Sequence, residues 1–451
     1  MTNPFIQTTP AQLGEMLKAC DASSIDELFD DQVPAELQFK GSHGLPAPLS
    51  ELELQRELTA LAAKNRPTTQ VVSFLGGGIY DHFVPTAIMH VANRQEYVTG
   101  YTPYQPEASQ GLLQAFFEYQ SLISRLYEMP VSNASLYDGA SALGEAIFLA
   151  LGIRPERNKI VMPNTVHPEY RALAKTYLAN FNAEIVPCGT MDGRIGLEVL
   201  DELIGPDTAA VIMQQPNYFG CIEEAQEVAN RAHHAGALLI VIADPLSLGV
   251  LAPPGSYGAD IAIGEGQPLG LNQFAGGESL GIFTCQKDFI RKVPGRLVGV
   301  ARDRENRRGF VLTLQTREQH IRREKATSNI CTNHAHNALR ATIYMCLMGP
   351  QGLGRVARSC VRGLERLRSA IEAKAPGAIA FPGPNFRELT LMCKRPANEV
   401  RDAMLAKDFY AGIPLGETLG KQFANHLLVA VTEKPTDDEI DAFATALEQY
   451  L

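Results

Sequence analysis

The sequence lacks several features that would place the protein in a membrane or outside the cell. Its 451 residues contain no run of eighteen apolar residues, the length needed to span a bilayer. The first twenty residues have no basic start followed by an apolar stretch, so no secretion signal is indicated. The eight cysteines are scattered and form no CxxC pair, which is typical of reduced thiols rather than of a disulfide or zinc framework. We therefore expect a cytoplasmic protein.

Excess basic charge is also absent. The sequence has 40 basic and 50 acidic residues, a net charge of -10, which argues against nucleic acid or an anionic membrane as the main partner. Arginines concentrate in residues 302–308 and 322–325, but acidic residues are mixed among them. We expect these two stretches to form a surface of salt bridges.

The pattern of apolar residues predicts three parts: an N-terminal helical arm (1–65), a large α/β domain (66–325) and a small α+β domain (326–451). In the large domain, short apolar strands alternate with helices, as in a mostly parallel sheet that is covered on both faces. The expected strands are 159–163, 183–187, 208–214, 237–243, 260–264 and 281–285.

Polar residues follow three of these strands, where ligands bind in open parallel sheets. They are residues 214–217, Asp244 and the 264–267 segment that ends in Gln267. An acid at the position of Asp244 could pair with the pyridine nitrogen of a cofactor such as pyridoxal phosphate. A role in a loop or a helix cap is the alternative, and the spacing leaves both open.

A second candidate site is the helix start at Asp138, Gly139 and Ser141. The free N–H groups of a helix start can bind phosphate. Asp138, however, is placed to cap the helix, where its carboxylate would occupy those donors and repel a phosphate. From these residues alone we predict a capped helix. His334 and His336 lie at another expected helix start without a third ligand, and no metal site is predicted.

An unusual loop, residues 100–107, precedes the first long helix. It contains Tyr101, Thr102, Tyr104 and Glu107, with two prolines that restrict its shape. The polar tips could face a ligand, and two aromatic residues on a rigid loop favour burial; a surface turn is the alternative.

Five long blocks carry a resemblance to a known family: FLGGGIYDHFVP (74–85), YTPYQPEASQGLLQAFFEYQ (101–120), NASLYDGASALGEA (133–146), GEGQPLGL (264–271) and REKATSNICTN (323–333). The chain resembles the glycine decarboxylase family, the P-protein of the glycine cleavage system, and more closely subunit 1 (alpha) of its split form. His334 departs from the glutamine expected after CTN. The resemblance implies an α/β, fold-type-I pyridoxal-phosphate-dependent transferase fold, with a mostly parallel seven-stranded type of sheet.

The resemblance also gives meaning to a missing lysine. A pyridoxal enzyme of this fold binds its cofactor through a lysine. That lysine lies on the loop after the strand that follows the acid paired with the pyridine nitrogen. Here that loop falls within residues 264–275, which contain no lysine. In the split enzyme the lysine belongs to subunit 2. The resemblance thus implies a degenerate cofactor site with Gln267 roughly where the lysine was and Asp138 at the phosphate position. That site comprises Asp138, Gly139, Ser141, Asp244 and Gln267, and no catalytic residue is expected in this chain alone.

The implied function is that of the subunit without a cofactor in a heteromeric glycine dehydrogenase. With pyridoxal phosphate on subunit 2, the complex decarboxylates glycine and transfers the aminomethyl group to the lipoyl arm of H-protein. Two copies of each subunit are expected, and Tyr101, Thr102, Tyr104 and Glu107 are expected to line the partner's glycine pocket. The alternatives are a self-sufficient pyridoxal-phosphate decarboxylase or aminotransferase, and a non-catalytic scaffold of the same fold.

Overall fold

The computed structural model describes residues 5–98, 100–273, 279–326, 328 and 330–451. Two compact units separate along the chain, Met1–Arg66 and Pro67–Leu451. The division into domains at residues 65 and 325 stays a prediction. No helix in the described ranges is both long enough and apolar enough to cross a membrane.

The first unit consists of three helices without a core. None of its described residues is buried. Local signals specify the helices instead: the Thr9, Ser24 and Ser50 side chains each accept a hydrogen bond from the first turn that follows them. The helices are α1 (Pro10–Ala19), α2 (Ile25–Gln32) and α3 (Glu51–Ala62).

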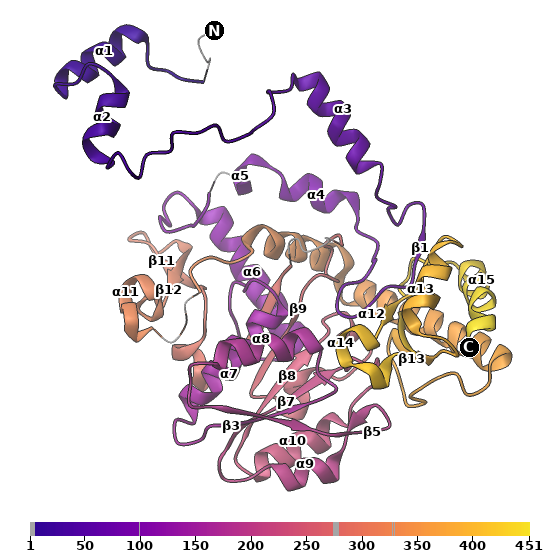
Figure 1. Cartoon of the computed structure of the whole chain (residues 1–451). Coiled ribbons are helices and arrows are strands. Elements are labelled where there is room, and N and C mark those ends of the chain that lie inside the picture. The colour runs from indigo at the N-terminus through magenta and orange to yellow at the C-terminus, as the bar shows by residue number, and fades with distance from the viewer. Residues whose placement is uncertain (1–4, 99, 274–278, 327, 329) are drawn as a thin grey trace. The chain divides into compact units, whose positions relative to one another are not determined.

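A seven-stranded sheet forms the centre of the second unit (Figure 1). Its strands pair in parallel from β9 to β4, while β10 is antiparallel to both of its neighbours. This confirms the expected mostly parallel sheet. The strand order is β2 (Val131–Ser132), β10 (Gly281–Cys285), β9 (Ile261–Glu265), β8 (Leu238–Ala243), β7 (Thr208–Gln215), β3 (Lys159–Pro163) and β4 (Glu184–Cys188).

Helices cover both faces of this sheet because alternate side chains of each strand point to opposite sides. In β8, Leu239 and Val241 join one apolar core, whereas Leu238 and Ile240 join the other. The first core receives α6 (Gln110–Tyr127), α9 (Leu197–Leu203), α10 (Ala225–His234) and the start of α12 (Ala335–Lys374). The second core receives α7 (Gly139–Ile153) and α8 (Pro168–Leu178).

The C-terminal part of the chain builds a second, smaller sheet. Its strands are antiparallel in the order β13 (Glu388–Met392), β16 (His426–Ala430) and β15 (Ile413–Pro414). The second half of α12 packs against this part, after an interruption at Gly349 (φ 57°) that precedes Pro350. A third apolar core joins the sheet to this half of α12, α13 (Ala397–Leu405) and α15 (Asp437–Leu447).

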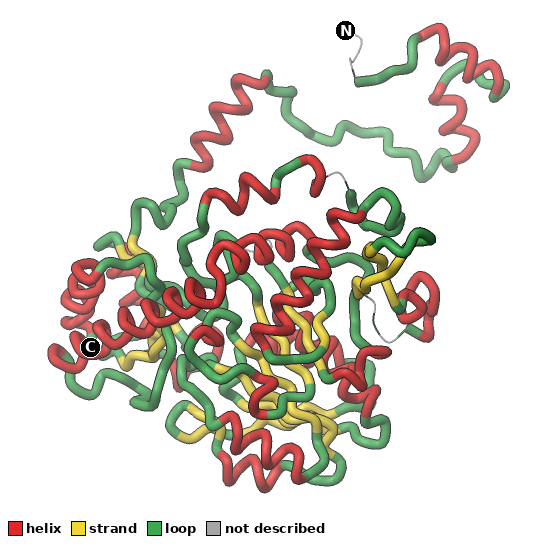
Figure 2. The backbone as a smooth tube through the Cα atoms, turned by 180° about the vertical axis from the view of Figure 1, so that it is seen from behind, coloured by secondary structure: helices red, strands yellow, loops and turns green. Residues whose placement is uncertain are grey.

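Short elements complete the second unit. Strand β1 pairs in parallel with β14, so the chain enters beside the small sheet before it continues toward the large one (Figure 2). The remaining strands are β1 (Val72–Ser73), β5 (Thr190–Met191), β6 (Arg194–Ile195), β11 (Leu297–Arg302), β12 (Arg308–Thr313) and β14 (Phe409–Tyr410). The short helices are α4 (Thr86–Ala92), α5 (Gln95–Val98), α11 (Gln319–Arg322) and α14 (Gly416–Leu419).

The β11–β12 hairpin and α11 correct one expectation. The prediction of a salt-bridged surface over residues 302–308 and 322–325 is wrong for most of the arginines. Within the described residues, only Arg307 of these stretches forms ion pairs, with Asp303 and Glu305. Asp303 also accepts backbone N–H groups from the hairpin turn, so its carboxylate is already used locally.

Candidate functional site at the carboxyl ends of the strands

A small cleft lies where β7, β8 and β9 end, between the large sheet and the start of β13. Tyr80, His167, Asp244, Glu265 and Arg387 are among its lining residues. The free volume is about 50 Å³. Ligand pockets usually measure roughly 300 Å³ or more. The side chains around the cleft therefore fill most of the space that a cofactor would need.

Asp244 forms an ion pair with Arg387 at the floor of this cleft. One carboxylate oxygen accepts hydrogen bonds from the backbone N–H groups of Leu246 (2.8 Å) and Ser247 (3.1 Å). The other oxygen accepts from the Arg387 guanidinium. Arg387 is only 1% exposed, and its guanidinium lies 3.3 Å from the centre of the Tyr80 ring. Asp244 therefore caps the turn after β8 and also neutralises a buried cation from the same chain.

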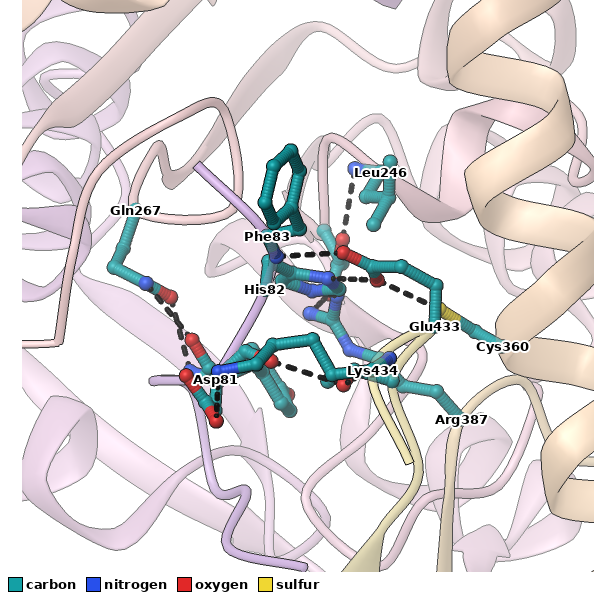
Figure 3. Close-up of polar contacts among 12 residues, drawn as sticks. Asp81, His82, Phe83, Leu246, Gln267, Cys360, Arg387, Glu433 and Lys434 are labelled. Atoms are coloured by element: carbon teal, nitrogen blue, oxygen red, sulfur yellow. Dashed lines mark hydrogen bonds and ion pairs between the residues drawn. The ribbon is translucent and has the colours of Figure 1, made fainter. Parts of the chain in front are cut away.

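His82 extends this contact toward Glu433 (Figure 3). An Arg387 nitrogen donates to His82 Nε2 at 2.7 Å, so the ring proton resides on Nδ1 and is donated to Glu433 at 2.6 Å. Burial lowers the pKa of His82, and the Arg387 charge acts in the same direction against the pull of Glu433. We call Asp244, Arg387, Tyr80, His82 and Glu433 the Arg387 cluster.

The Arg387 cluster also explains why three potential metal ligands lie together. Ligand-type atoms of His82, Cys360 and Glu433 lie within 4.8 Å of one another. However, Nδ1 of His82 carries a proton and Nε2 accepts from Arg387, so neither ring nitrogen is free. Burial raises the pKa of the Cys360 thiol, which disfavours the thiolate that metals bind. The chemistry of the cluster is that of a hydrogen-bonded ion network.

Glu388, the residue after Arg387, binds the glycine-rich segment (residues 76–80) that crosses the cleft. Its carboxylate accepts from the Gly77 N–H at 2.6 Å and from the Tyr80 hydroxyl at 2.8 Å. Burial raises the pKa of Glu388, although the Arg387 charge opposes the shift. A side chain on Gly76 would collide with this carboxylate, because its Cβ would lie 2.2 Å from Oε1.

At the start of α7, the predicted cap is present. The Ser141 N–H donates a hydrogen bond to the Asp138 carboxylate at 2.6 Å, and the Ser141 hydroxyl accepts one from the Asp138 N–H. Gly139 N–H donates to Glu265 at 3.1 Å, and burial raises the pKa of Glu265 to about 7. The N–H groups of Gly139 and Ser141 therefore both donate to carboxylates of this chain. Ser141 donates to Asp138, and Gly139 donates to Glu265, the last residue of β9.

Gln267 lies in the chain between two residues that line the cleft, Glu265 and Pro268, but is not itself part of the lining. Its side-chain amide accepts from the Tyr80 N–H and donates to the carbonyls of Tyr80 and Leu271, each at 2.9 Å. It is only 1% exposed. The amide thus ties the loop after β9 to the glycine-rich segment.

The structure places Asp138, Gly139, Ser141, Asp244 and Gln267 around the strand ends, where Gly139 and Gln267 both donate to Glu265 of β9 and Asp244 follows β8. It keeps the 100–107 loop apart from them. Tyr101 is 82% exposed and its hydroxyl bonds Thr332 at 2.9 Å, while Tyr104 is 48% exposed and lies edge-on to His320. Thr102 and Glu107 also lie outside the cleft lining. The loop presents its tyrosines outward.

Residues 214–217 divide between the cleft and its support. Gln214 accepts from the His167 N–H at 2.8 Å and lines the cleft. Gln215 and Asn217 instead bind Glu223 and thereby fix the loop after β7.

Sequence reasoning missed Tyr80, His82, His167, Arg387 and Glu388. The first two lie within the FLGGGIYDHFVP block, which the sequence singled out only as a resemblance. Arg387 and Glu388 form a charged pair at the start of the apolar strand β13. Because charged residues are seldom buried without partners, this pair is the sequence signal that could have pointed to a site there.

Comparisons with known proteins now identify the family. A family model described as glycine cleavage system P-protein matches residues 3–447. The chain belongs to this P-protein family. Among relatives, it is 49% identical over 445 residues to "Probable glycine dehydrogenase (decarboxylating) subunit 1" of Chlorobium chlorochromatii, covering 98% of this chain and 99% of the relative.

Solved structures agree with this assignment. A crystal structure of "glycine decarboxylase (P-protein) of the glycine cleavage system, in inhibitor-bound form" matches with a TM-score of 0.91 and 41% identity, covering 100% of both chains. Among more distant matches, a sphingosine-1-phosphate lyase of Burkholderia pseudomallei has a TM-score of 0.64 at 13% identity, covering 92% of this chain and 94% of that one. This P-protein has the fold-type-I architecture of pyridoxal-phosphate-dependent enzymes, which confirms the expected fold.

Proposed function

We propose that this chain is the subunit of a two-chain glycine decarboxylase that carries no pyridoxal phosphate. A lysine-bearing subunit 2 supplies the cofactor. Together the two subunits release the carboxylate of glycine as carbon dioxide and pass the aminomethyl group to the lipoyl arm of H-protein. The eight cysteines are all free, which fits the reducing cytoplasm where we place this activity.

The observation that carries the proposal is that the residues at the strand ends do not fit the cofactor. Arg387 neutralises Asp244, which would otherwise pair with a protonated pyridine. Carboxylates occupy the α7 N–H groups that would bind a phosphate, and residues 264–275 contain no lysine. The cleft therefore supports a structural role in this chain and argues against a self-sufficient pyridoxal-phosphate enzyme.

The 100–107 loop supports a contribution to the partner's site. Tyr101 and Tyr104 expose bulky rings with hydroxyl tips, and Pro103 is buried at the base of the loop. Glycine has no side chain, so an enzyme specific for it must fill the space beside the α-carbon and bind the carboxylate. In our proposal the two tyrosines and Thr102 line the glycine pocket across the interface, while Glu107 orients a neighbouring group.

Reconstitution with the lysine-bearing subunit tests the proposal. The purified chain should show no visible absorbance from bound pyridoxal phosphate and no activity, whereas the two subunits together should exchange the glycine carboxylate with bicarbonate. Light scattering should give two copies of each subunit.

Three results would contradict parts of this proposal. Stoichiometric cofactor on a lysine of this chain would show a self-sufficient enzyme. An assembled complex that exchanges no better than subunit 2 alone would show a scaffold. A chain that stays separate from subunit 2 at micromolar concentration would remove the heteromer.

A further inference from the structure

One segment of this acidic chain is strongly basic. Residues 287–325, which we call the basic segment, contain twelve lysines and arginines but only five acidic residues. Ten of the twelve are exposed; Arg296 and Arg317 are the exceptions. The segment therefore presents a positive surface on a protein whose net charge is -10.

Most of these exposed cations have no carboxylate partner. Within the described residues, only Arg307 of the ten forms ion pairs. In the hairpin, Arg302 lies directly opposite Arg308. Like charges at directly opposed positions destabilise a strand pair, so this arrangement carries a cost in the isolated chain. Such a cost is expected where the charges serve a function outside the fold.

The positive surface has a firm support. The Arg317 guanidinium donates to the backbone carbonyls of Val293 and Gly295, which joins the turn after β12 to the chain before β11. Gln110 of α6 exchanges two hydrogen bonds with the backbone of Phe310, at 2.8 and 2.9 Å. The hairpin is thus fixed on the large domain.

The basic segment is continuous with the 100–107 loop. Tyr104 contacts His320 edge-on, with 6.0 Å between ring centres, and the Arg296 guanidinium lies 5.7 Å from the Tyr104 ring. A partner bound on the basic segment would therefore sit beside the loop that we assign to the glycine pocket.

We propose that the basic segment docks an acidic face of the carrier protein that presents the lipoyl arm. This inference rests on the proposed function, because the arm must reach the glycine pocket to accept the aminomethyl group. Positive charge around the entrance would speed and orient the encounter with an acidic carrier. A nucleic acid fits less well, because the chain as a whole carries a net charge of -10.

A triple variant, Arg302→Gln, Arg304→Gln and Arg308→Gln, tests the docking. The matched control removes the same charge elsewhere through Arg355→Gln, Arg358→Gln and Arg395→Gln, all at exposed positions. In the assembled complex, we expect the triple variant to raise the KM for lipoylated H-protein by about tenfold, since removing charges at an interface rim slows association. The turnover number and the KM for glycine should match the control. The KM for H-protein should also depend less strongly on salt than in the control.

Direct titration of H-protein into the complex by calorimetry separates this inference from the proposed function. If the wild-type complex binds H-protein more tightly than the triple variant does but does not process glycine, the proposed function fails and the docking stands. A triple variant that binds and turns over like the control would overturn the docking. So would weakened assembly with subunit 2, or tight binding of a single-stranded oligonucleotide at the same salt, because each would assign the basic segment to another partner.

Discussion

Replacing Arg387 by methionine should destabilise the second unit severely. Arg387→Met keeps an unbranched side chain of moderate volume but removes the charge that neutralises Asp244. Removing one member of a buried ion pair typically costs 3–5 kcal/mol, because the remaining charge stays buried without its partner. His82 Nε2 would lose its donor as well, which costs about 1 kcal/mol more. Since these contacts are coupled, we expect a total loss of about 3–5 kcal/mol in the free energy of unfolding.

Urea unfolding followed by circular dichroism measures this effect, with Arg395→Met, at an exposed position, as the control. The control should change stability by about 0.5 kcal/mol or less. The double variant Asp244→Asn with Arg387→Met should lose clearly less stability than the two single variants added together, because it leaves no unpaired charge. If Arg387→Met cost less than about 1 kcal/mol, or if the two changes were additive, the Arg387 cluster would not stabilise the fold as we argue.

Two further predictions concern one buried acid and the exposed loop. Burial raises the pKa of Glu145 from 4.5 to about 7, so the folded state holds a proton that the unfolded state releases, and stability should fall as pH rises from about 4.5 to 7. Glu145→Gln should therefore be more stable than the natural chain at pH 8, by at most about 3 kcal/mol, and similarly stable at pH 4.5. Glu399→Gln, at an exposed position, is the control. If the stability of Glu145→Gln and of the natural chain changed in parallel with pH, the argument would be refuted. Tyr104→Phe should cost about 1–3 kcal/mol in glycine binding or turnover without loss of assembly. If Tyr101→Phe and Tyr104→Phe both assemble and exchange carboxylate normally, the loop packs an interface only.

Local patterns in the sequence determined much of the framework. Strands β3, β7, β8 and β9 follow runs of apolar residues that are continuous because both faces of the sheet are covered. Asp138 was predicted as a helix cap because the cap and its N–H donor lie only three residues apart. The missing lysine in residues 264–275 is likewise visible without any structure.

Only the tertiary structure decided which side chains meet in the cleft at the strand ends. Arg387 and Asp244 are 143 residues apart, and His82 and Glu433 are 351 residues apart. Such pairs leave no periodic or spaced pattern, because their contact depends on how the small sheet packs against the large one. The same holds for the arginines of residues 302–308. Their mixture with acids suggested salt bridges, but the hairpin register places Arg302 opposite Arg308 while the turn backbone engages Asp303. Sequence composition counts charges, whereas pairing depends on geometry that forms only when the chain folds.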